Sequence, residues 1–256
     1  MKLTFDEKLA ENYKSVSQKA RILTEYWVKD SAFCPNCGYF NINKYQNNKP
    51  VADFFCPKCN EDYELKSKQG IIETKILDGA YNKKIERLQS NNNPNLFILN
   101  YNLMSLSVIN FFVIPKHFFV PEIIEKRKPL ADNARRAGWI GSNILLQKIP
   151  QAGKIFLVRQ GKIESKEKVL AEWKKTLFLR KEKEVYVRGW LLDIMRCIEK
   201  IDKNEFILED IYNFENELSA LHPENKHIKD KIRQQLQILR DRGYLDFVSR
   251  GYYRLL

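Results

Sequence analysis

The chain has 256 residues, of which 44% are hydrophobic and 12% aromatic, so it can bury a substantial core and form two domains. This composition excludes a disordered or fibrous chain. The formal net charge of +12 favours a polyanionic partner such as nucleic acid, although a generally cationic or membrane-adhering surface gives the same sum.

The N-terminal stretch Met1–Lys8 is charged and lacks the apolar run and cleavage site of a secretory signal. The most apolar stretch, Leu96–Ile114, is interrupted by asparagines, which is typical of buried strands rather than of a membrane span. We therefore expect a cytoplasmic protein with no membrane partner, and the sequence indicates no obligatory protein partner.

A helix is expected over Ser15–Lys29, because Ala20, Leu23 and Trp27 recur at helical spacing behind serines that can cap it. The segment that follows, Cys34–Cys59, is rich in Gly, Pro and Asn and cannot form a conventional hydrophobic core alone. This segment needs another source of stability.

Four cysteines supply that source. Cys34 and Cys37 form one Cys-x-x-Cys pair, and Cys56 and Cys59 form a second pair after 18 intervening residues. Two such knuckles predict one tetrahedral, structural zinc site, since four thiolates leave no position for water. Disulfides and a redox dithiol are the alternatives, and the absence of a secretory signal and the doubled motif argue against them. Cys197 is expected to be a small buried residue without chemistry.

Further elements predict a mixed α/β domain that reaches to about residue 180. Short apolar and alternating runs indicate strands, and one amphipathic run between them indicates a helix. The strands are expected within Val51–Lys66, Leu96–Leu99, Ile109–Ile114 and Lys154–Val158, and the helix over Asp78–Gln89.

A possible catalytic group lies around the second cysteine pair. Side chains alternate along a strand, so Glu64 and Lys66 project together while Tyr63 and Leu65 face the other way. If Asp53 lies on the partner strand, two carboxylates offer hard oxygen ligands for Mg²⁺ and the lysine can orient a water. This set resembles the PD-(D/E)xK nuclease pattern, with Ala in place of the usual Pro. The pattern is loose, and chance placement at a strand edge is the alternative.

Two other functions fit parts of the sequence. A zinc-ribbon and winged-helix regulator would bind DNA without cutting it, and the carboxylates would then be incidental. A nuclease of the HNH class pairs zinc knuckles with a catalytic histidine, but His117, His222 and His227 all lie far from the cysteines. We therefore favour the PD-(D/E)xK interpretation.

A second domain is expected after the charged linker 180–184. Residues 1–180 hold 30 basic and 18 acidic side chains and so carry the whole net positive charge. Residues 181–256 hold 14 of each, so any basic surface on this second domain must be local. Three amphipathic helices, the last ended by Gly243, and a hairpin predict a winged helix. The predicted helices span Gly189–Lys200, Glu205–Leu221 and Asn225–Arg242, and the strands span Tyr244–Val248 and Tyr252–Leu255.

The third of these helices has a polar face that is suited to a major groove. Arg and Gln side chains distinguish guanine and adenine edges, and side chains of the hairpin can reach the backbone or minor groove. A winged helix that contacts protein is the alternative. The candidate DNA-binding residues are Lys229, Arg233, Gln234 and Gln237 on the helix and Arg250 and Tyr252 on the hairpin.

Nearly the whole chain resembles the DpnI-like, methyl-directed type II restriction endonucleases. The resemblance is carried by CPNCG (34–38), NKPVADF (48–54), ELKSK (64–68), NNNPN (91–95), RKPLA (127–131), ARRAGWIG (134–141), HIK (227–229) and KIRQQLQILRD (231–241). It implies an α/β fold with a restriction-endonuclease-like mixed sheet flanked by helices, an inserted zinc ribbon, and a C-terminal winged helix-turn-helix. The expected domains are 1–180 and 181–256.

The resemblance also implies site residues and a substrate. Asp53, Glu64 and Lys66 match the catalytic acids and lysine, and the carbonyl of Leu65 matches a third Mg²⁺ ligand. Trp139 matches an aromatic residue placed against DNA near the modified base, and flanking Arg135 and Arg136 suit phosphates. The implied partner is double-stranded DNA, cut at GATC where the adenine carries an N6-methyl group.

Overall fold

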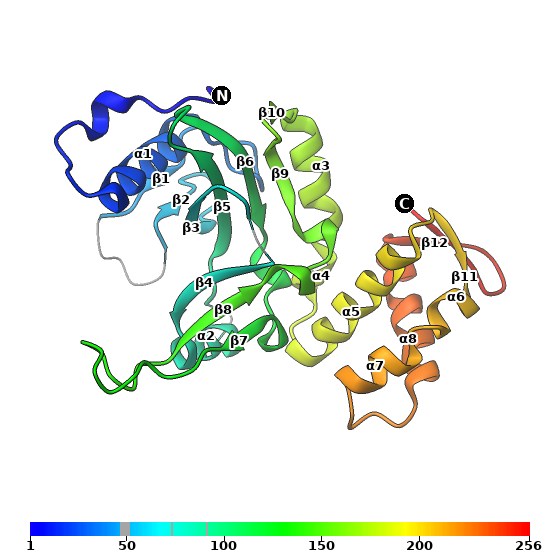
Figure 1. Ribbon diagram of the computed structural model, residues 1–256. Coiled ribbons are helices and arrows are strands. Elements are labelled where there is room, and N and C mark those ends of the chain that lie inside the picture. Colours follow the sequence, from blue (N-terminus) through cyan, green and yellow to red (C-terminus); the bar gives the residue numbers. More distant parts are fainter. Residues whose placement is uncertain (47–51, 73, 91) are drawn as a thin grey trace. The chain divides into compact units, whose positions relative to one another are not determined.

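The computed structural model describes residues 1–46, 52–72, 74–90 and 92–256 (Figure 1). The chain forms two compact units. The first comprises Met1–Leu146 with Ala152–Lys174, and the second comprises Gln147–Gln151 with Lys175–Leu256. Val51, where a strand pattern was expected to begin, lies outside the described residues.

A seven-stranded sheet forms the centre of the first unit, in the order β1-β2-β3-β5-β6-β9-β10. The pair β3–β5 is parallel, and the other neighbours are antiparallel. The first seven residues of β5 are buried, as expected of a central strand. The strands span β1 Asn43–Lys44, β2 Phe54–Phe55, β3 Asp62–Gln69, β5 Asn95–Asn102, β6 Ser107–Ile114, β9 Ile155–Arg159 and β10 Lys162–Ile163.

Aromatic rings pack together on this sheet. Phe97 of β5 is fully buried. Its ring stacks on Tyr63 of β3 with the ring centres 4.4 Å apart, and it lies tilted against Phe111 of β6 with the centres 4.9 Å apart. Helix α1 (Val16–Ser31) adds Trp27, whose ring meets Phe111 edge-on at 5.2 Å. The helix expected over residues 15–29 is therefore confirmed, and its apolar face covers the sheet beside β3.

A smaller sheet of order β4-β8-β7 and helix α2 (Tyr81–Gln89) complete the site-bearing part of the unit. The strands span β4 Lys75–Ala80, β7 Ile124–Lys126 and β8 Gly141–Leu145. The expectation of a helix from Asp78 was wrong at its start, because Asp78–Ala80 pairs with β8 and ends in a bulge at Gly79.

One longer helix that the sequence analysis did not predict follows the strands, and several short helices lie between the other elements. Helix α3 (Lys166–Thr176) buries Val169 and Trp173. The other connections are η1 Glu7–Ala10, η2 Lys116–Phe118, η3 Pro121–Ile123, η4 Leu146–Lys148, η5 Gln151–Gly153 and α4 Phe178–Lys181.

The second unit has the predicted outline of helices followed by a hairpin. Its three strands form a sheet of order β11-β13-β12. Gly243 follows α8 with φ +71°, a left-handed conformation that ends helices and favours glycine. The elements are α5 Val185–Ile201, β11 Glu205–Ile207, α6 Leu208–Tyr212, α7 Glu215–Leu221, α8 Ile228–Asp241, β12 Leu245–Ser249 and β13 Tyr252–Leu255.

One predicted helix of this unit needs correction. Residues 205–221 were expected to form a single helix, but Glu205–Ile207 forms strand β11 and the rest divides into α6 and α7. The three strand residues alternate exposed, buried and exposed, with Phe206 inside, which is a period of two rather than 3.6. Pairing with β13 takes up their backbone groups.

None of the described helices combines the length and apolar character that crossing a bilayer requires.

Replacing Phe97 with Ala should lower the free energy of unfolding of the protein by about 3–5 kcal/mol, because it removes a fully buried ring and leaves a cavity. Equilibrium urea unfolding measures the change. Met104→Ala is the control, since Met104 is 95% exposed and its loss should change stability by less than about 0.5 kcal/mol. A loss for Phe97→Ala no larger than that of the control would contradict the assigned core.

Candidate active site and metal cluster

The four predicted cysteines lie together. Their sulfur atoms are all within 4.8 Å of one another, with Cys34 and Cys56 buried and Cys37 and Cys59 half-buried. A backbone hydrogen bond closes each knuckle, from Gly38 N to the Cys34 carbonyl at 2.8 Å and from Asn60 N to the Cys56 carbonyl at 2.9 Å. Four converging sulfurs suit a tetrahedral metal ion such as zinc.

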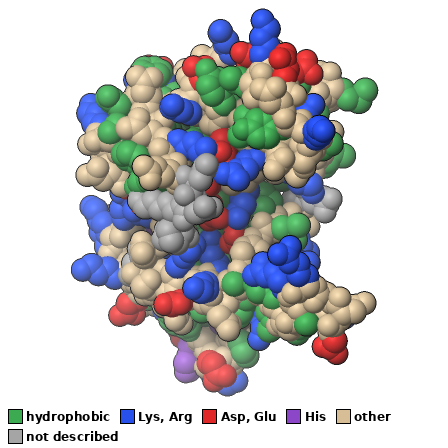
Figure 2. Space-filling view, turned by 90° about the vertical axis from the view of Figure 1, so that its left-hand side faces the viewer, with side chains coloured by type: hydrophobic (Ala, Val, Ile, Leu, Met, Phe, Trp, Pro, Cys, Tyr) green, Lys and Arg blue, Asp and Glu red, His purple; other side chains and the backbone are tan. Residues whose placement is uncertain are grey.

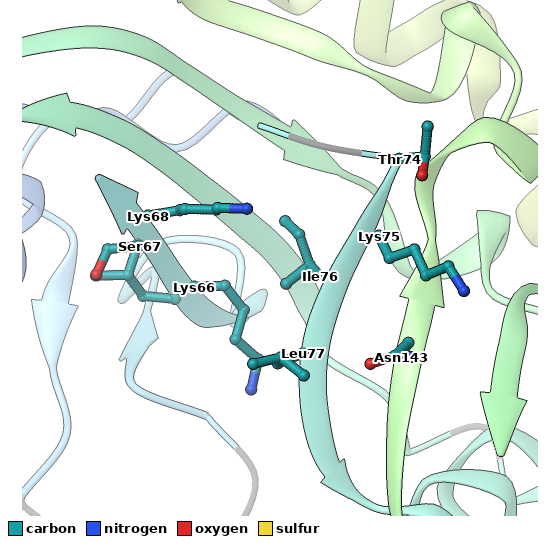
Figure 3. A pocket seen from close by; sticks show the side chains of 9 residues that line it. Lys66, Ser67, Lys68, Thr74, Lys75, Ile76, Leu77 and Asn143 are labelled. Atoms are coloured by element: carbon teal, nitrogen blue, oxygen red, sulfur yellow. The ribbon is translucent and has the colours of Figure 1, made fainter. Parts of the chain in front are cut away.

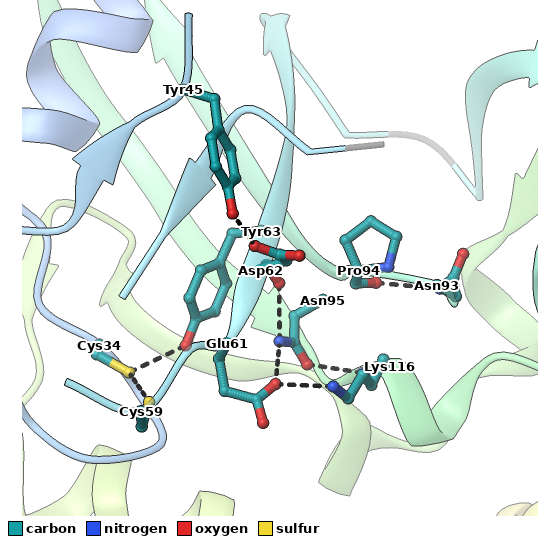
Figure 4. A network of polar contacts seen from close by, with 10 residues as sticks. All are labelled: Cys34, Tyr45, Cys59, Glu61, Asp62, Tyr63, Asn93, Pro94, Asn95 and Lys116. Carbon is teal, nitrogen blue, oxygen red and sulfur yellow. Dashed lines mark hydrogen bonds and ion pairs between the residues drawn. The ribbon is translucent and has the colours of Figure 1, made fainter. Parts of the chain in front are cut away.

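Tyr63 connects the thiol cluster to strand β3. Its hydroxyl lies 3.1 Å from Cys34 Sγ, as Figure 4 shows. Burial raises the pKa of both the Cys34 thiol and the Tyr63 hydroxyl. Tyr63 therefore stays protonated and can donate to a metal-bound thiolate, the kind of outer hydrogen bond that holds metal ligands in place.

A second set of polar contacts fixes the start of β3 (Figure 4). The buried Asn95 amide donates to Glu61 Oε2 at 2.8 Å and to the Asp62 carbonyl at 2.9 Å. Lys116 Nζ lies 3.2 Å from Glu61 Oε2, and Tyr45 donates to Asp62 Oδ1 at 2.7 Å. Side chains from three other segments thus hold the strand that carries the candidate catalytic residues.

The structure brings the three predicted catalytic side chains to one place. The backbone N–H of Asp53 donates to the Tyr63 carbonyl at 2.9 Å, so the two segments are neighbours as expected. The Leu65 N–H in turn donates to Asp53 Oδ2 at 2.7 Å. On β3, Glu64 Oε1 lies 2.6 Å from Lys66 Nζ. The Asp53 carboxylate is therefore held next to the strand from which Glu64 and Lys66 project.

Two further charged residues at this site were missed by the sequence analysis. Asp78 Oδ1 of β4 lies 2.9 Å from Lys66 Nζ, and Lys84 Nζ of α2 lies 3.1 Å from Asp78 Oδ2 and 3.8 Å from Glu64 Oε2. The side chains of Asp78 and Lys84 are each only 5% exposed. No short motif contains them, and among the many charged residues of the sequence they give no signal of burial.

Electrostatics differ among the acids. Burial and the nearby Glu64 charge raise the pKa of Asp53. Burial also acts against ionisation of Asp78, but Lys84 and Lys66 outweigh it and lower the pKa of that carboxyl. Burial opposes the charge of Lys66, but Glu64 and Asp78 raise the pKa of its ammonium above the usual range. Lys66 is therefore charged at neutral pH in the metal-free protein.

A cavity of about 610 Å³ opens beside Lys66, between β3 and β4 (Figure 3). Lys66 and Lys68 line it from β3, Lys75 and Leu77 from β4, and Asn143 from β8. Lys and Arg side chains gather around acidic ones across the middle of the face in Figure 2. Basic side chains beside a carboxylate site are suited to a polyanionic substrate.

The predicted loop residues lie between β7 and β8. Backbone bonds from Leu130 N to the Trp139 carbonyl and from Gly138 N to the Leu130 carbonyl, both 3.0 Å, close this loop. Arg135 and Arg136 are exposed, and the Arg136 guanidinium lies 4.7 Å from the centre of the half-buried Trp139 ring. The loop thus presents an aromatic side chain with cations beside it.

The predicted helix residues lie on the exposed face of α8. Lys229, Arg233, Gln234 and Gln237 are all exposed, whereas the apolar stripe of Ile228, Ile232, Leu236 and Leu239 is buried. Lys229 Nζ and the Arg233 guanidinium lie 5.3 and 5.7 Å from the centre of the Tyr212 ring. Gln234 Oε1 accepts from Lys231 Nζ at 2.8 Å.

The hairpin and the buried face of α8 hold three more polar side chains. Arg250 is exposed in the turn between β12 and β13. Tyr252 is half-buried on β13, and its hydroxyl donates to Glu205 Oε2 at 3.0 Å. Gln235 is fully buried, which the sequence analysis did not anticipate, because a glutamine among exposed Gln and Arg residues carries no sign of burial.

These features are typical of the restriction-endonuclease class of DNA-binding proteins. They are a mixed sheet with clustered carboxylates and a lysine, a four-cysteine cluster and a helix-turn-helix unit. Residues 1–182 match the DpnI family, described as Dam-replacing, and residues 186–255 match the Dam-replacing HTH domain. The chain belongs to the DpnI Dam-replacing family. This family membership and the helix-turn-helix domain imply a DNA-binding, methylation-dependent restriction endonuclease and confirm the predicted fold class and resemblance.

The thiol cluster should hold about one zinc ion per chain, measurable by atomic absorption on protein purified without added metal. Cys56→Ser should abolish zinc retention and lower the melting temperature, because three thiolates hold the ion more weakly and metal binding contributes to folding. Cys197→Ser is the matched control, since Cys197 is buried in α5 and lies outside the cluster. Equal zinc contents in the two variants would contradict the assignment.

Proposed function

We propose that the protein is a magnesium-dependent endonuclease that hydrolyses double-stranded DNA at GATC sites carrying N6-methyladenine. One observation carries the catalytic part: Asp53, Glu64 and Lys66 converge on strand β3, next to a cavity lined by further lysines. The sequence specificity follows from the family resemblance, which extends over both units.

The chemistry of the acids supports a magnesium site. The carboxylates of Asp53 and Glu64 and the carbonyl of Leu65 are hard oxygen donors, which Mg²⁺ prefers. Burial and the negative charge of Glu64 raise the pKa of Asp53, so these groups repel one another without a cation between them. A bound Mg²⁺ supplies charge stabilisation and a more acidic water for phosphodiester hydrolysis.

Lys66 is the cation of the predicted catalytic group. Its ammonium has three donors and no acceptor, so it can hold a water or a phosphate oxygen while it stays bonded to a carboxylate. Because the pKa of Lys66 lies above its usual range, its charge is present at neutral pH and can offset the charge that develops on the phosphate.

We assign DNA recognition to two regions, each described within its own unit. In the first unit, Arg135 and Arg136 bind phosphates and Trp139 contacts the bases near the methyl group. In the second unit, the exposed face of α8 enters the major groove and Arg250 contacts the backbone. The exposure of these arginines and of the polar α8 side chains supports this assignment.

Glu64→Ala and Lys66→Ala should each lower magnesium-dependent DNA cleavage by at least about 100-fold, since each removes a group from the site of charge development. Rates of plasmid cleavage under single-turnover conditions measure the effect. Glu164→Ala removes an acid that pairs with Lys168 on the surface of the same unit and should cut at the normal rate. Unchanged cleavage by the Glu64 or Lys66 variant would overturn the assigned catalytic group.

A plasmid prepared with N6-methyladenine at GATC should be cut in the presence of Mg²⁺ and remain intact with excess EDTA, and the unmethylated plasmid should remain intact in both. Mapping of the ends checks the sequence that is cut. Equal cutting of both plasmids would contradict the proposed dependence on methylation. DNA binding without cutting under any divalent ion would contradict the proposed nuclease activity and favour a DNA-binding regulator.

A further inference from the structure

Lys66 lies between two carboxylates, and the nuclease motif accounts for only one of them. Its Nζ atom is 2.6 Å from Glu64 Oε1 and 2.9 Å from Asp78 Oδ1. In the proposed function Glu64 is a magnesium ligand, so its oxygens are shared with the metal. Asp78 is then the partner that remains to hold the Lys66 ammonium.

Asp78 lies in β4 directly before a local irregularity of that strand. The pairing of β4 with β8 shifts register between Asp78 and Ala80. Such a bulge bends the strand and redirects side chains, and bulges are enriched near active sites. Gly79 occupies the bulge, and its carbonyl accepts a hydrogen bond from Ser142 Oγ at 3.0 Å. The bulge is therefore anchored from the neighbouring strand.

Lys84 in turn holds Asp78. It lies on α2, the helix that begins directly after β4, with its Nζ atom 3.1 Å from Asp78 Oδ2 and 5.1 Å from the centre of the Phe119 ring. Because its side chain is 5% exposed, a DNA strand cannot take it as a phosphate contact without rearrangement. The Lys84 charge is thus directed at the carboxylates of the protein.

We propose that Asp78 and Lys84 are positioning residues for Lys66, a role that rests on the proposed nuclease function. Asp78 holds the ammonium of Lys66 as a second carboxylate beside Glu64, and Lys84 holds Asp78 in place. The β4 bulge and the first turn of α2 therefore belong to the catalytic unit although neither carries a motif residue.

The charges of the group support this arrangement. Asp53, Glu64 and Asp78 carry three negative charges, and Lys66 and Lys84 carry two positive ones, which leaves one excess negative charge for a divalent cation. Without Asp78, Lys84 would be a buried cation whose nearest described acid is Glu64, at 3.8 Å, where it competes with Lys66. Without Lys84, Lys66 is the remaining ion-pair partner of Asp78 among the described residues, and Asp78 draws it away from Glu64.

A stabilising role alone does not account for these residues. Burying charged groups costs free energy that their attraction seldom exceeds, so a buried ion pair adds little to stability compared with apolar packing. A role in orientation gives the pair a function, since a misplacement of about 1 Å can lower the rate of catalysis by about 100-fold.

The test uses four full-length variants: Asp78→Asn, Lys84→Met, the double variant Asp78→Asn/Lys84→Met, and Lys84→Arg. The first readout needs no magnesium and no cleavage. It is the rate at which acetic anhydride acylates Lys66 in EDTA, mapped by mass spectrometry and normalised to the exposed Lys14. The second is the kcat and KM for methylated plasmid in Mg²⁺. Melting temperatures in EDTA report whether each variant folds.

Loss of Asp78 should release Lys66, so its acylation in Asp78→Asn should become at least threefold faster. The kcat should fall about 10- to 100-fold, while KM stays within about threefold, because Asp78 positions Lys66 rather than binding DNA. Lys84→Met should also lower kcat, because Asp78 then draws Lys66 away from Glu64, and Lys84→Arg should retain most of kcat, since it keeps the charge. Glu164→Gln is the matched control and should match the wild type in both readouts.

The double variant keeps the test decisive if either single variant fails to fold, since it leaves neither buried charge without a partner. Unchanged Lys66 acylation in a folded double variant overturns the positioning role, whether or not the protein cuts DNA. A normal kcat in that variant overturns it as well. Faster acylation in a protein that cuts no DNA leaves the positioning role intact and removes the nuclease function.

Discussion

The alternation of side chains along β3 is the constraint on which the rest of the first unit depends. Tyr63 faces the core, stacks on Phe97 and reaches the thiol cluster, whereas Glu64 and Lys66 project into the candidate site. One strand therefore joins the hydrophobic core to the charged group, and a shift by one residue would exchange the two faces. The parallel pairing with β5, along seven residue pairs, fixes this register.

The thiol cluster and the charged site are joined through the same short segment of chain. The second cysteine pair, Cys56–Cys59, lies in the connection between Asp53 and Glu64, so a metal held there closes the turn that brings Asp53, directly before β2, next to β3. The Tyr63 hydroxyl and the Asn95 amide add contacts from the same strand and from β5. A structural metal thereby stabilises a segment rich in turns, which cannot bury enough apolar surface by itself.

Much of this arrangement could be predicted from the sequence, and the features that could not be predicted depend on contacts between distant residues. The cysteine pairs, the alternation around Glu64 and the amphipathic helix α8 are periodic or motif-like signals, and the structure contains all three. Asp78 was assigned to a helix because the strand pairing of β4 depends on β8, which is more than 60 residues away. Burial of Lys84 and Gln235 likewise depends on tertiary packing, which composition and spacing do not encode.

The bulge in β4 also restricts which mutations this protein can tolerate. A substitution in residues 75–80 alters one side chain, whereas deletion of the Gly79 codon would remove the extra residue, straighten the strand and shift the start of α2, and with it Lys84, relative to Asp78. Selection on this strand then acts on its length at least as strongly as on its composition. Relatives that keep the reaction are expected to maintain the residue count between Ile76 and α2.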